Sequence, residues 1–222
     1  MKFAIWILLL AAPLQAAPPQ MPAPQMSPAQ PPPHASPFSA DMEENATDLA
    51  GNMRDIKGKI YVSRPHVRMD MQQTGHPLII LLVNTTTKTT DMLYPEQDKY
   101  MEIKADPKNP MEHGSGMATE IAALRSNPCA EGKDTACKNL GTEQVNGRTC
   151  EHWQITDKNG KVIGNVWLDR SLHIGIKSIS ERGTGQLTNV KEGEQPASLF
   201  KVPPGYQKID LARMMQGRQR QQ

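Results

Sequence analysis

The sequence has few aromatic residues, little net charge and no long hydrophobic run. Aromatic residues make up 5% of its 222 residues, and the formal net charge is +2. So small a positive excess gives no electrostatic footprint for nucleic acid, and we expect no nucleic-acid partner. A transmembrane helix needs about 18 or more consecutive apolar residues. No segment approaches that length, so we expect that the protein is not integral to a membrane.

Motifs for catalysis and for cofactor binding are missing as well. "HGSG" at 113–116 is not a nucleophile elbow, because Gly114 directly precedes Ser115 and no predicted strand leads into it. No glycine loop for phosphate is present, and the six histidines are scattered with no C-x-x-C spacing. We therefore expect no enzyme, no cofactor and no metal site.

The chain begins with the three-part pattern of a secretory signal. Lys2 precedes an apolar run at 3–12, and the small-residue site "LQA" follows. The pattern predicts a signal peptide over residues 1–16 that is cleaved near Ala16. We therefore expect an exported protein of the periplasm.

The composition changes twice along the rest of the chain. Residues 17–37 are rich in proline and glutamine, which predicts a disordered tether. Residues 38–213 have the length of one domain, and residues 214–222 form a polar, flexible tail. We expect this domain to be a monomer.

Cysteine is scarce and odd in number, with Cys129, Cys137 and Cys150. In an oxidising compartment one disulfide and one buried thiol is the simplest arrangement. Cys129 and Cys137 would close the short loop "CAEGKDTAC". The alternative joins Cys150 to one of them, which needs an irregular strand, because Cys150 falls opposite Glu143 in the predicted hairpin.

Alternating apolar and polar residues, separated by turn residues, dominate the domain. Asn146-Gly147 and "DKNG" at 157–160 are typical of tight hairpin turns, since a type I′ turn requires positive φ at both central residues. The pattern predicts a mainly β (α+β) domain built as an antiparallel meander. Its predicted strands are "FSADM", "GKIYVS", "HVRMDMQ", "LIILLV", "TTDMLY", "KYMEI", "NLGTEQV", "RTCEHWQI", "KVIGNVWLD", "GIKSISE" and "GQLTNVK".

One segment has helical spacing. In "SGMATEIAALRS", Met117, Ile121 and Leu124 share one face of a helix that Pro128 would end. Such a helix can bury its apolar face across an open, curved sheet. Whether it covers a ligand or simply packs on the core stays open.

Several segments resemble known families. "SRPHVRMDM" at 63–71 and "SLFKVPPGYQKIDL" at 198–211 resemble segments of the periplasmic lipoprotein carriers of the LolA type. "LGTEQVNGRTCEHWQI", "VWLDRSLHIGIK" and "GEQPASLFKVPPGY" look like an uncharacterised bacterial family of unknown function with a predicted LolA-like fold. The resemblance implies an incomplete antiparallel β-barrel of about eleven strands, with one or a few capping helices over an apolar hollow.

Methionines and one arginine are the candidate site residues. Methionine adapts its flexible side chain to ligands of differing shape. In the carriers the arginine that matches Arg68 holds a lid, so the resemblance implies a lid or gate role for Arg68. Strict alternation puts Arg68 on the face opposite Met69 unless a bulge intervenes near Pro65, and otherwise Arg68 pairs with Asp70 or Glu102. The residues predicted to line the hollow are Met69, Met71, Met92, Met101, Met117, Ile121 and Leu124.

The sequence leaves three functions open. The first, which we favour, is a non-enzymatic binding protein that shelters an acyl chain, a lipid or a lipoprotein. The second is an envelope sensor or adaptor that binds a partner protein. The third is a structural module whose hollow is filled by its own side chains. An apolar ligand retained through purification would distinguish the first.

Overall fold

The computed structural model describes residues 35–47, 51–104 and 135–209, which belong to one compact unit. The predicted signal peptide, the tether up to residue 34 and the tail lie outside the described residues. The predicted helix with Met117, Ile121 and Leu124 and the cysteine Cys129 also lie outside them. Among the described residues, no helix is long and apolar enough to cross a membrane.

Within the described residues, twelve strands form a single sheet, and two short 3₁₀ helices, η1 (Pro95–Gln97) and η2 (Ala197–Phe200), interrupt it. The strands are β1 (Phe38–Thr47), β2 (Met53–Ser63), β3 (His66–Gln73), β4 (Ile79–Asn84), β5 (Thr89–Tyr94), β6 (Lys99–Lys104), β7 (Thr135–Val145), β8 (Arg148–Asp157), β9 (Val162–Asp169), β10 (Ile174–Ser180), β11 (Gly183–Glu192) and β12 (Gln207–Lys208).

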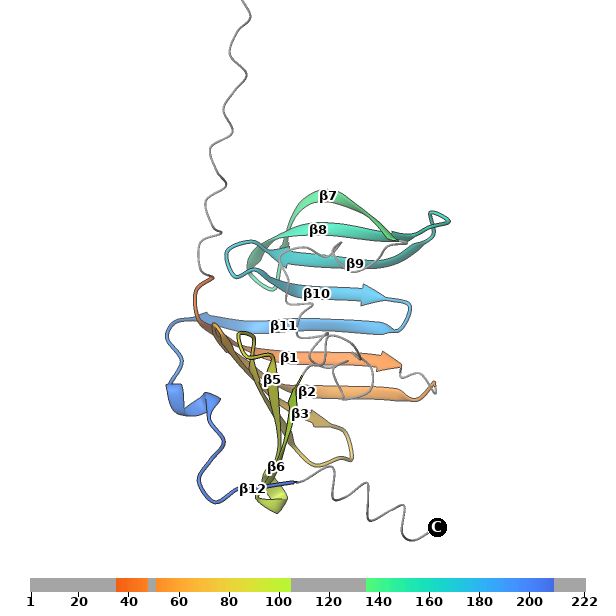
Figure 1. Ribbon diagram of the computed structural model, residues 1–222. Coiled ribbons are helices and arrows are strands. Elements are labelled where there is room, and N and C mark those ends of the chain that lie inside the picture. Colours follow the sequence, from red (N-terminus) through yellow and green to blue (C-terminus); the bar gives the residue numbers. More distant parts are fainter. Residues whose placement is uncertain (1–34, 48–50, 105–134, 210–222) are drawn as a thin grey trace, which may run out of the picture. The chain divides into compact units, whose positions relative to one another are not determined.

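The sheet is an open, incomplete barrel (Figure 1). Its order is β12-β6-β5-β4-β3-β2-β1-β11-β10-β9-β8-β7, so β1 pairs with β11 and joins the two halves. All neighbours are antiparallel except β12, which runs parallel to β6. Within the described ranges the two edge strands, β7 and β12, are not paired with each other.

The predicted fold class is confirmed. All eleven strands expected from alternation are present, and Gln207–Lys208 adds the twelfth. Asn146 and Gly147 have φ values of 49° and 78°, as the predicted hairpin turn requires. Cys150 lies opposite Glu143 in the ladder between β7 and β8, as the sequence predicts.

The strands from β3 to β5 bury side chains on both faces of the sheet. One face, which we name the Met69 face, contributes to the larger core cluster, and the other, the Arg68 face, carries the smaller one. The smaller cluster consists of Ile80, Leu82 and Leu93, with Leu78, Tyr100, Val202 and Tyr206 packed against it. The larger cluster consists of Phe38, Ala40, Ile60, Val62, Val67, Leu81, Val83, Cys150, Trp167, Leu172, Ile174, Ile176 and Leu187.

The C-terminal strap, residues 197–209, covers part of the Arg68 face. The amides of Gln207 and Ile209 donate to the carbonyls of Asp98 and Tyr100 at 2.8 and 2.7 Å, which extends the sheet beyond β6. Val202 and Tyr206 of the strap pack against the smaller cluster. The strap thus explains why β4 is apolar on both faces.

Candidate ligand-binding pocket

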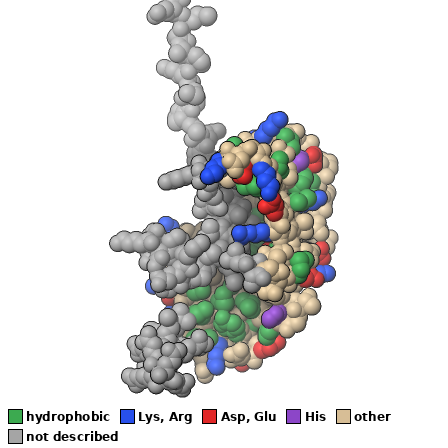
Figure 2. Space-filling view, turned by 90° about the vertical axis from the view of Figure 1, so that its right-hand side faces the viewer, with side chains coloured by type: hydrophobic (Ala, Val, Ile, Leu, Met, Phe, Trp, Pro, Cys, Tyr) green, Lys and Arg blue, Asp and Glu red, His purple; other side chains and the backbone are tan. Residues whose placement is uncertain are grey.

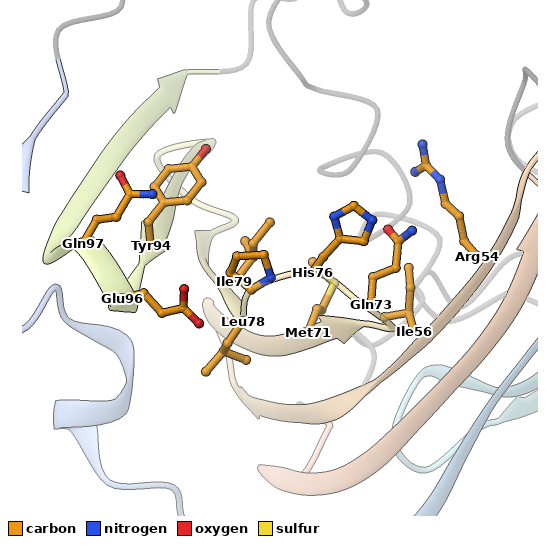
Figure 3. Close-up of a pocket in the computed structure, with 11 residues that line it drawn as sticks. Arg54, Ile56, Met71, Gln73, His76, Leu78, Ile79, Tyr94, Glu96 and Gln97 are labelled. Carbon is orange, nitrogen blue, oxygen red and sulfur yellow. The ribbon is translucent and has the colours of Figure 1, made fainter.

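A pocket of about 320 Å³ opens at the end of β2 and β3, beside the turn into β4 (Figure 3). Its size is at the lower end of the range of roughly 300–1,000 Å³ that is common for small-molecule sites. The residues around it come from β2, β3, β4, β5, the turn between β3 and β4, and η1. They are Arg54, Ile56, Met71, Gln73, His76, Pro77, Leu78, Ile79, Tyr94, Glu96 and Gln97.

The floor of the pocket is apolar because strand register aligns three hydrophobic side chains. Met71 lies opposite Ile79 in the ladder between β3 and β4, and Ile56 lies opposite Gln73 in the ladder between β2 and β3. Met71 and Ile79 are partly buried against the larger core cluster. Hydrophobic side chains also gather in the lower half of the face drawn in Figure 2, with charged side chains around them.

The turn between β3 and β4 places His76 at the pocket. Gly75 has a φ of +78°, a left-handed conformation that glycine adopts without strain. The amide of His76 donates to the carbonyl of Gln73 at 3.0 Å, and Nε2 of Gln72 donates to the carbonyl of His76 at 3.2 Å. These bonds fix the turn, and Pro77 then leads into β4.

The opposite wall comes from β5 and η1. The hydroxyl of Tyr94 donates to Sδ of Met92 at 3.0 Å, which ties the tyrosine to its own strand. Pro95 begins η1, and Asp98 ends it with a φ of 50° and an amide that donates to the carbonyl of Pro95. Glu96 and Gln97 of η1 complete this wall (Figure 3).

Four of the predicted methionines lie within the described ranges, and of these four only Met71 lines the pocket. Met71 is a pocket residue, and Met69 and Met92 are partly buried against the larger core cluster. Met101 is partly buried and lies directly opposite Met92 in the ladder between β5 and β6. A ligand-binding role for these residues stays a prediction, as it does for Met117, Ile121 and Leu124 outside the described residues.

Arg68 lies on the face opposite Met69. The ladder between β2 and β3 runs without a shift from His66 to Gln73, so the bulge that would have brought both side chains to one face is not there. Nε and Nη2 of Arg68 donate to the carboxylate of Asp70 at 2.6 and 3.2 Å, and Nη1 donates to the carbonyl of Leu199 at 3.1 Å. Of the two expected carboxylate partners, Asp70 is the one that Arg68 contacts.

The bond to Leu199 therefore joins Arg68 on β3 to the C-terminal strap. The predicted helix lies outside the described residues, and a gate at the pocket would require Arg68 on the Met69 face. Alternation alone, without a bulge, predicts the observed side. The gate role implied by the resemblance stays a prediction.

Sequence reasoning missed most of the pocket. Arg54, His76 and Tyr94 were not among the predicted site residues. Arg54 and Ile56 alternate along β2 and lie on the face that also carries Met71, so pairing the rows of β2 and β3 would have found them. No local sequence pattern predicts η1, because this 3₁₀ helix has only three residues.

A second polar cluster joins the edge strand β7 to β8 and β9. Nδ1 of His152 lies 2.7 Å from Oε1 of Glu143, and Nε1 of Trp167 donates to Oε2 of Glu143 at 2.7 Å. The hydrogen bonds from Trp167 and then from His152 lower the pKa of Glu143. Glu151, the sequence neighbour of His152, pairs instead with Arg170 at 2.5 Å. None of these residues lines the pocket.

Cys150 is a fully buried free thiol. The alternative disulfide through Cys150 is therefore wrong, because this side chain packs in the larger core cluster. The pairing of Cys129 with Cys137 stays a prediction, since Cys129 lies outside the described residues. Within the described ranges, no three histidine, cysteine or acidic side chains are grouped as metal ligands.

The Cys150 thiol is expected to resist alkylation in the folded protein. Burial first, and then the nearby Asp169, raise its pKa to about 11. At pH 8 only about one thiol in a thousand would be ionised, and the thiolate is the reactive form. Iodoacetamide labelling followed by mass spectrometry should therefore modify Cys150 only after unfolding in guanidinium. Rapid labelling of the native protein would show that this part of the core opens readily.

Solved structures with a similar fold include three at low sequence identity. A MucA/MucB complex from Pseudomonas aeruginosa is 15% identical with a TM-score of 0.46, covering 80% of this chain and 59% of that chain. A LolA superfamily protein from Nitrosomonas europaea is 7% identical with a TM-score of 0.38, and the match covers 75% of this chain and 90% of that chain. A β-barrel-like DUF1849 protein from Brucella abortus is 10% identical with a TM-score of 0.32, and the match covers 72% of this chain and 99% of that chain.

These likenesses concern the fold alone. The chain spans less than two thirds of the length of the MucB structures that it matches. No curated protein sequence matches it significantly.

The sequence-based resemblance to a family of unknown function is confirmed by a family model. The model is described as a domain of unknown function, DUF4412, and it matches residues 41–175. The match runs from β1 into β10 and so includes every strand that lines the pocket. More than half of the chain is covered, and the protein therefore belongs to the DUF4412 family.

Proposed function

We propose that the protein is a non-enzymatic binding protein of the periplasm that shelters an acyl chain in the pocket of Figure 3. The observation that carries the proposal is the apolar floor of Ile56, Met71 and Ile79 in a pocket of about 320 Å³. Met71 suits this role because its side chain is flexible and polarizable. Export to the periplasm rests on the N-terminal signal pattern.

Burial of hydrocarbon supplies enough free energy for such a role. Each methylene group removed from water contributes about 0.8 kcal/mol, so about eight of them contribute about 6 kcal/mol. The ordering of the ligand and the loss of its free motion subtract from this sum. The remaining free energy of binding is moderate, and moderate affinity suits a carrier that must release its ligand.

The decisive experiment is an organic extraction of the protein purified from its native host. Mass spectrometry of the extract should find a lipid or fatty acid in a defined ratio to protein. An extract without any acyl compound, from protein that also fails to bind added fatty acid, would overturn the proposal.

Filling the pocket should weaken ligand binding. Met71→Trp adds a bulky side chain to the floor, and we expect the affinity for a fluorescent fatty acid to fall at least about tenfold, which corresponds to about 1.4 kcal/mol. Met53→Trp is the matched control, because Met53 is 72% exposed and does not line the pocket. Equal affinity of both variants would place the ligand elsewhere.

A partner-binding role is the second candidate, and the edge strand β7 favours it. β7 has eleven residues, most of them exposed, and within the described residues it pairs only with β8. An extended peptide can add a strand to such an edge. An empty extract together with a protein captured stoichiometrically from envelope extracts would favour this adaptor role over the carrier.

A further inference from the structure

The polar side chains of the pocket are divided between its two ends (Figure 3). Arg54, Gln73 and His76 lie at one end, and Glu96 and Gln97 lie at the other. The first group carries N–H donors on every side chain, and the second contains the only carboxylate among the described lining residues. The apolar floor runs between the two ends.

The donor end is held by the backbone. Gln73 lies directly opposite Ile56 in the ladder, and Arg54 lies two residues before Ile56 on the same face of β2. The ladder continues beyond this pair, because the amide of Thr74 donates to the carbonyl of Asp55 at 3.1 Å. The turn that ends β3 then brings His76 to the same end.

We infer that the pocket selects amphiphiles with an anionic head group, and that the head lies at the Arg54 end. This inference rests on the proposed function, because it assigns a head group to the acyl chain proposed above. A guanidinium is always charged, and its N–H groups match the oxygens of a carboxylate or a phosphate. The chain of the amphiphile then crosses Met71 and Ile79 toward Tyr94.

The charges along β1 and β2 limit what else could bind there. Glu44 is the cross-strand partner of Ile56, but it does not line the pocket. Lys57 lies on the other face of β2, where it pairs with Glu43 at 3.8 Å. A cationic head would instead meet Glu96 at the far end, where it would face the one carboxylate among the described lining residues.

The test uses the full-length protein and four probes that share one alkyl chain. The probes are hexadecanoate, hexadecyl phosphate, hexadecanol and hexadecylamine, each used below its aggregation concentration in a competition assay with a fluorescent fatty acid. We expect both anions to bind about tenfold more tightly than the alcohol and the amine. The preference should shrink as salt is added, because exposed charges are screened. The ratio of the two anions distinguishes a fatty-acid head from a phospholipid head.

Charge reversal locates the head group. Arg54→Glu should lower the affinity for both anions about tenfold and leave hexadecanol unchanged. Lys57→Glu makes the same change of charge on the other face and should have little effect. Unchanged hexadecanol binding also shows that Arg54→Glu is folded.

Three outcomes would overturn the inference. If the alcohol binds as tightly as the anions, the pocket shelters the chain without selecting its head. If the amine binds most tightly, the head lies at the Glu96 end. If no probe binds at all, the inference fails together with the proposed function.

Discussion

Replacing Arg68 with leucine is expected to lower the free energy of unfolding by about 3 kcal/mol. The guanidinium makes two bonds to Asp70 and one to the carbonyl of Leu199, and the two charged side chains are only 17% and 23% exposed. Breaking such a pair leaves a partly buried carboxylate without its counter-charge, which typically costs about 3–5 kcal/mol when burial is complete. Partial exposure places the expected loss at the lower end.

Urea unfolding at neutral pH measures this loss, and two controls separate its causes. Arg68→Lys keeps the charge but loses the planar fork, so it should recover only part of the stability. The double variant Arg68→Leu/Asp70→Leu removes both charges and should recover most of it. A double variant no more stable than Arg68→Leu would show that the unpaired Asp70 is not the cause.

Arg68→Leu also tests whether Arg68 holds the strap in place and whether it acts as a gate for the ligand. The amides of Gln207 and Ile209 should exchange hydrogen faster in this variant, because the contact at Leu199 helps to hold the strap. The amount of acyl ligand retained should stay unchanged, since Arg68 lies on the face opposite the pocket. Ligand loss from a folded variant would restore the gate role.

The strand pattern was predictable because its signals are local. Alternation in "HVRMDMQ" and the Asn146-Gly147 turn depend only on neighbouring residues, and both were read correctly. The same alternation placed Arg68 and Met69 on opposite faces. The gate role came instead from the resemblance, and a hollow lined by both Arg68 and Met69 required a bulge that the continuous ladder lacks.

The strap and the pocket were not predictable in the same way. The strap segment "KVPPGYQK" has two prolines and no alternation, and its place depends on contacts with residues more than a hundred positions away, such as Arg68. The pocket combines the ends of four strands, β2 to β5, with the turn before β4 and with η1. Its shape depends on the curvature of the sheet, which no single segment encodes.

Replacing Asp91 with leucine is expected to stabilise the protein by about 1–3 kcal/mol at pH 7. Asp91 lies on the Arg68 face, opposite Glu102 on β6, and its Oδ1 is buried without a hydrogen-bond partner among the described residues. A buried polar atom without a partner costs about 1–3 kcal/mol. Leucine removes this atom and the like charge, and it can pack beside Leu82, its cross-strand neighbour on β4.

The gain should depend on pH in a defined direction. Burial first, and then the charge of Glu102, raise the pKa of Asp91, while Lys208 opposes them. The folded protein therefore binds this proton more tightly than the unfolded chain. Stability from Asp91 is fully present below its unfolded pKa of about 3.9 and is lost as the pH rises through the higher folded pKa. The advantage of Asp91→Leu should accordingly be largest at neutral pH and shrink in acid.

Asp91→Asn separates charge from polarity, because it removes the charge and keeps a polar side chain. The free energy of unfolding of Asp91→Asn and of the native chain is measured in urea from pH 4 to pH 8. The native chain should lose stability as Asp91 ionises, and Asp91→Asn should not show this loss. The other charges near Asp91, Glu102 with Lys208 at 3.1 Å and Lys104 at 3.9 Å, are unchanged in both variants. If the native chain and Asp91→Asn have parallel pH profiles, Asp91 titrates alike in the folded and unfolded states. The carboxylate beneath the strap would then carry no penalty, and any gain in Asp91→Leu would come from packing alone.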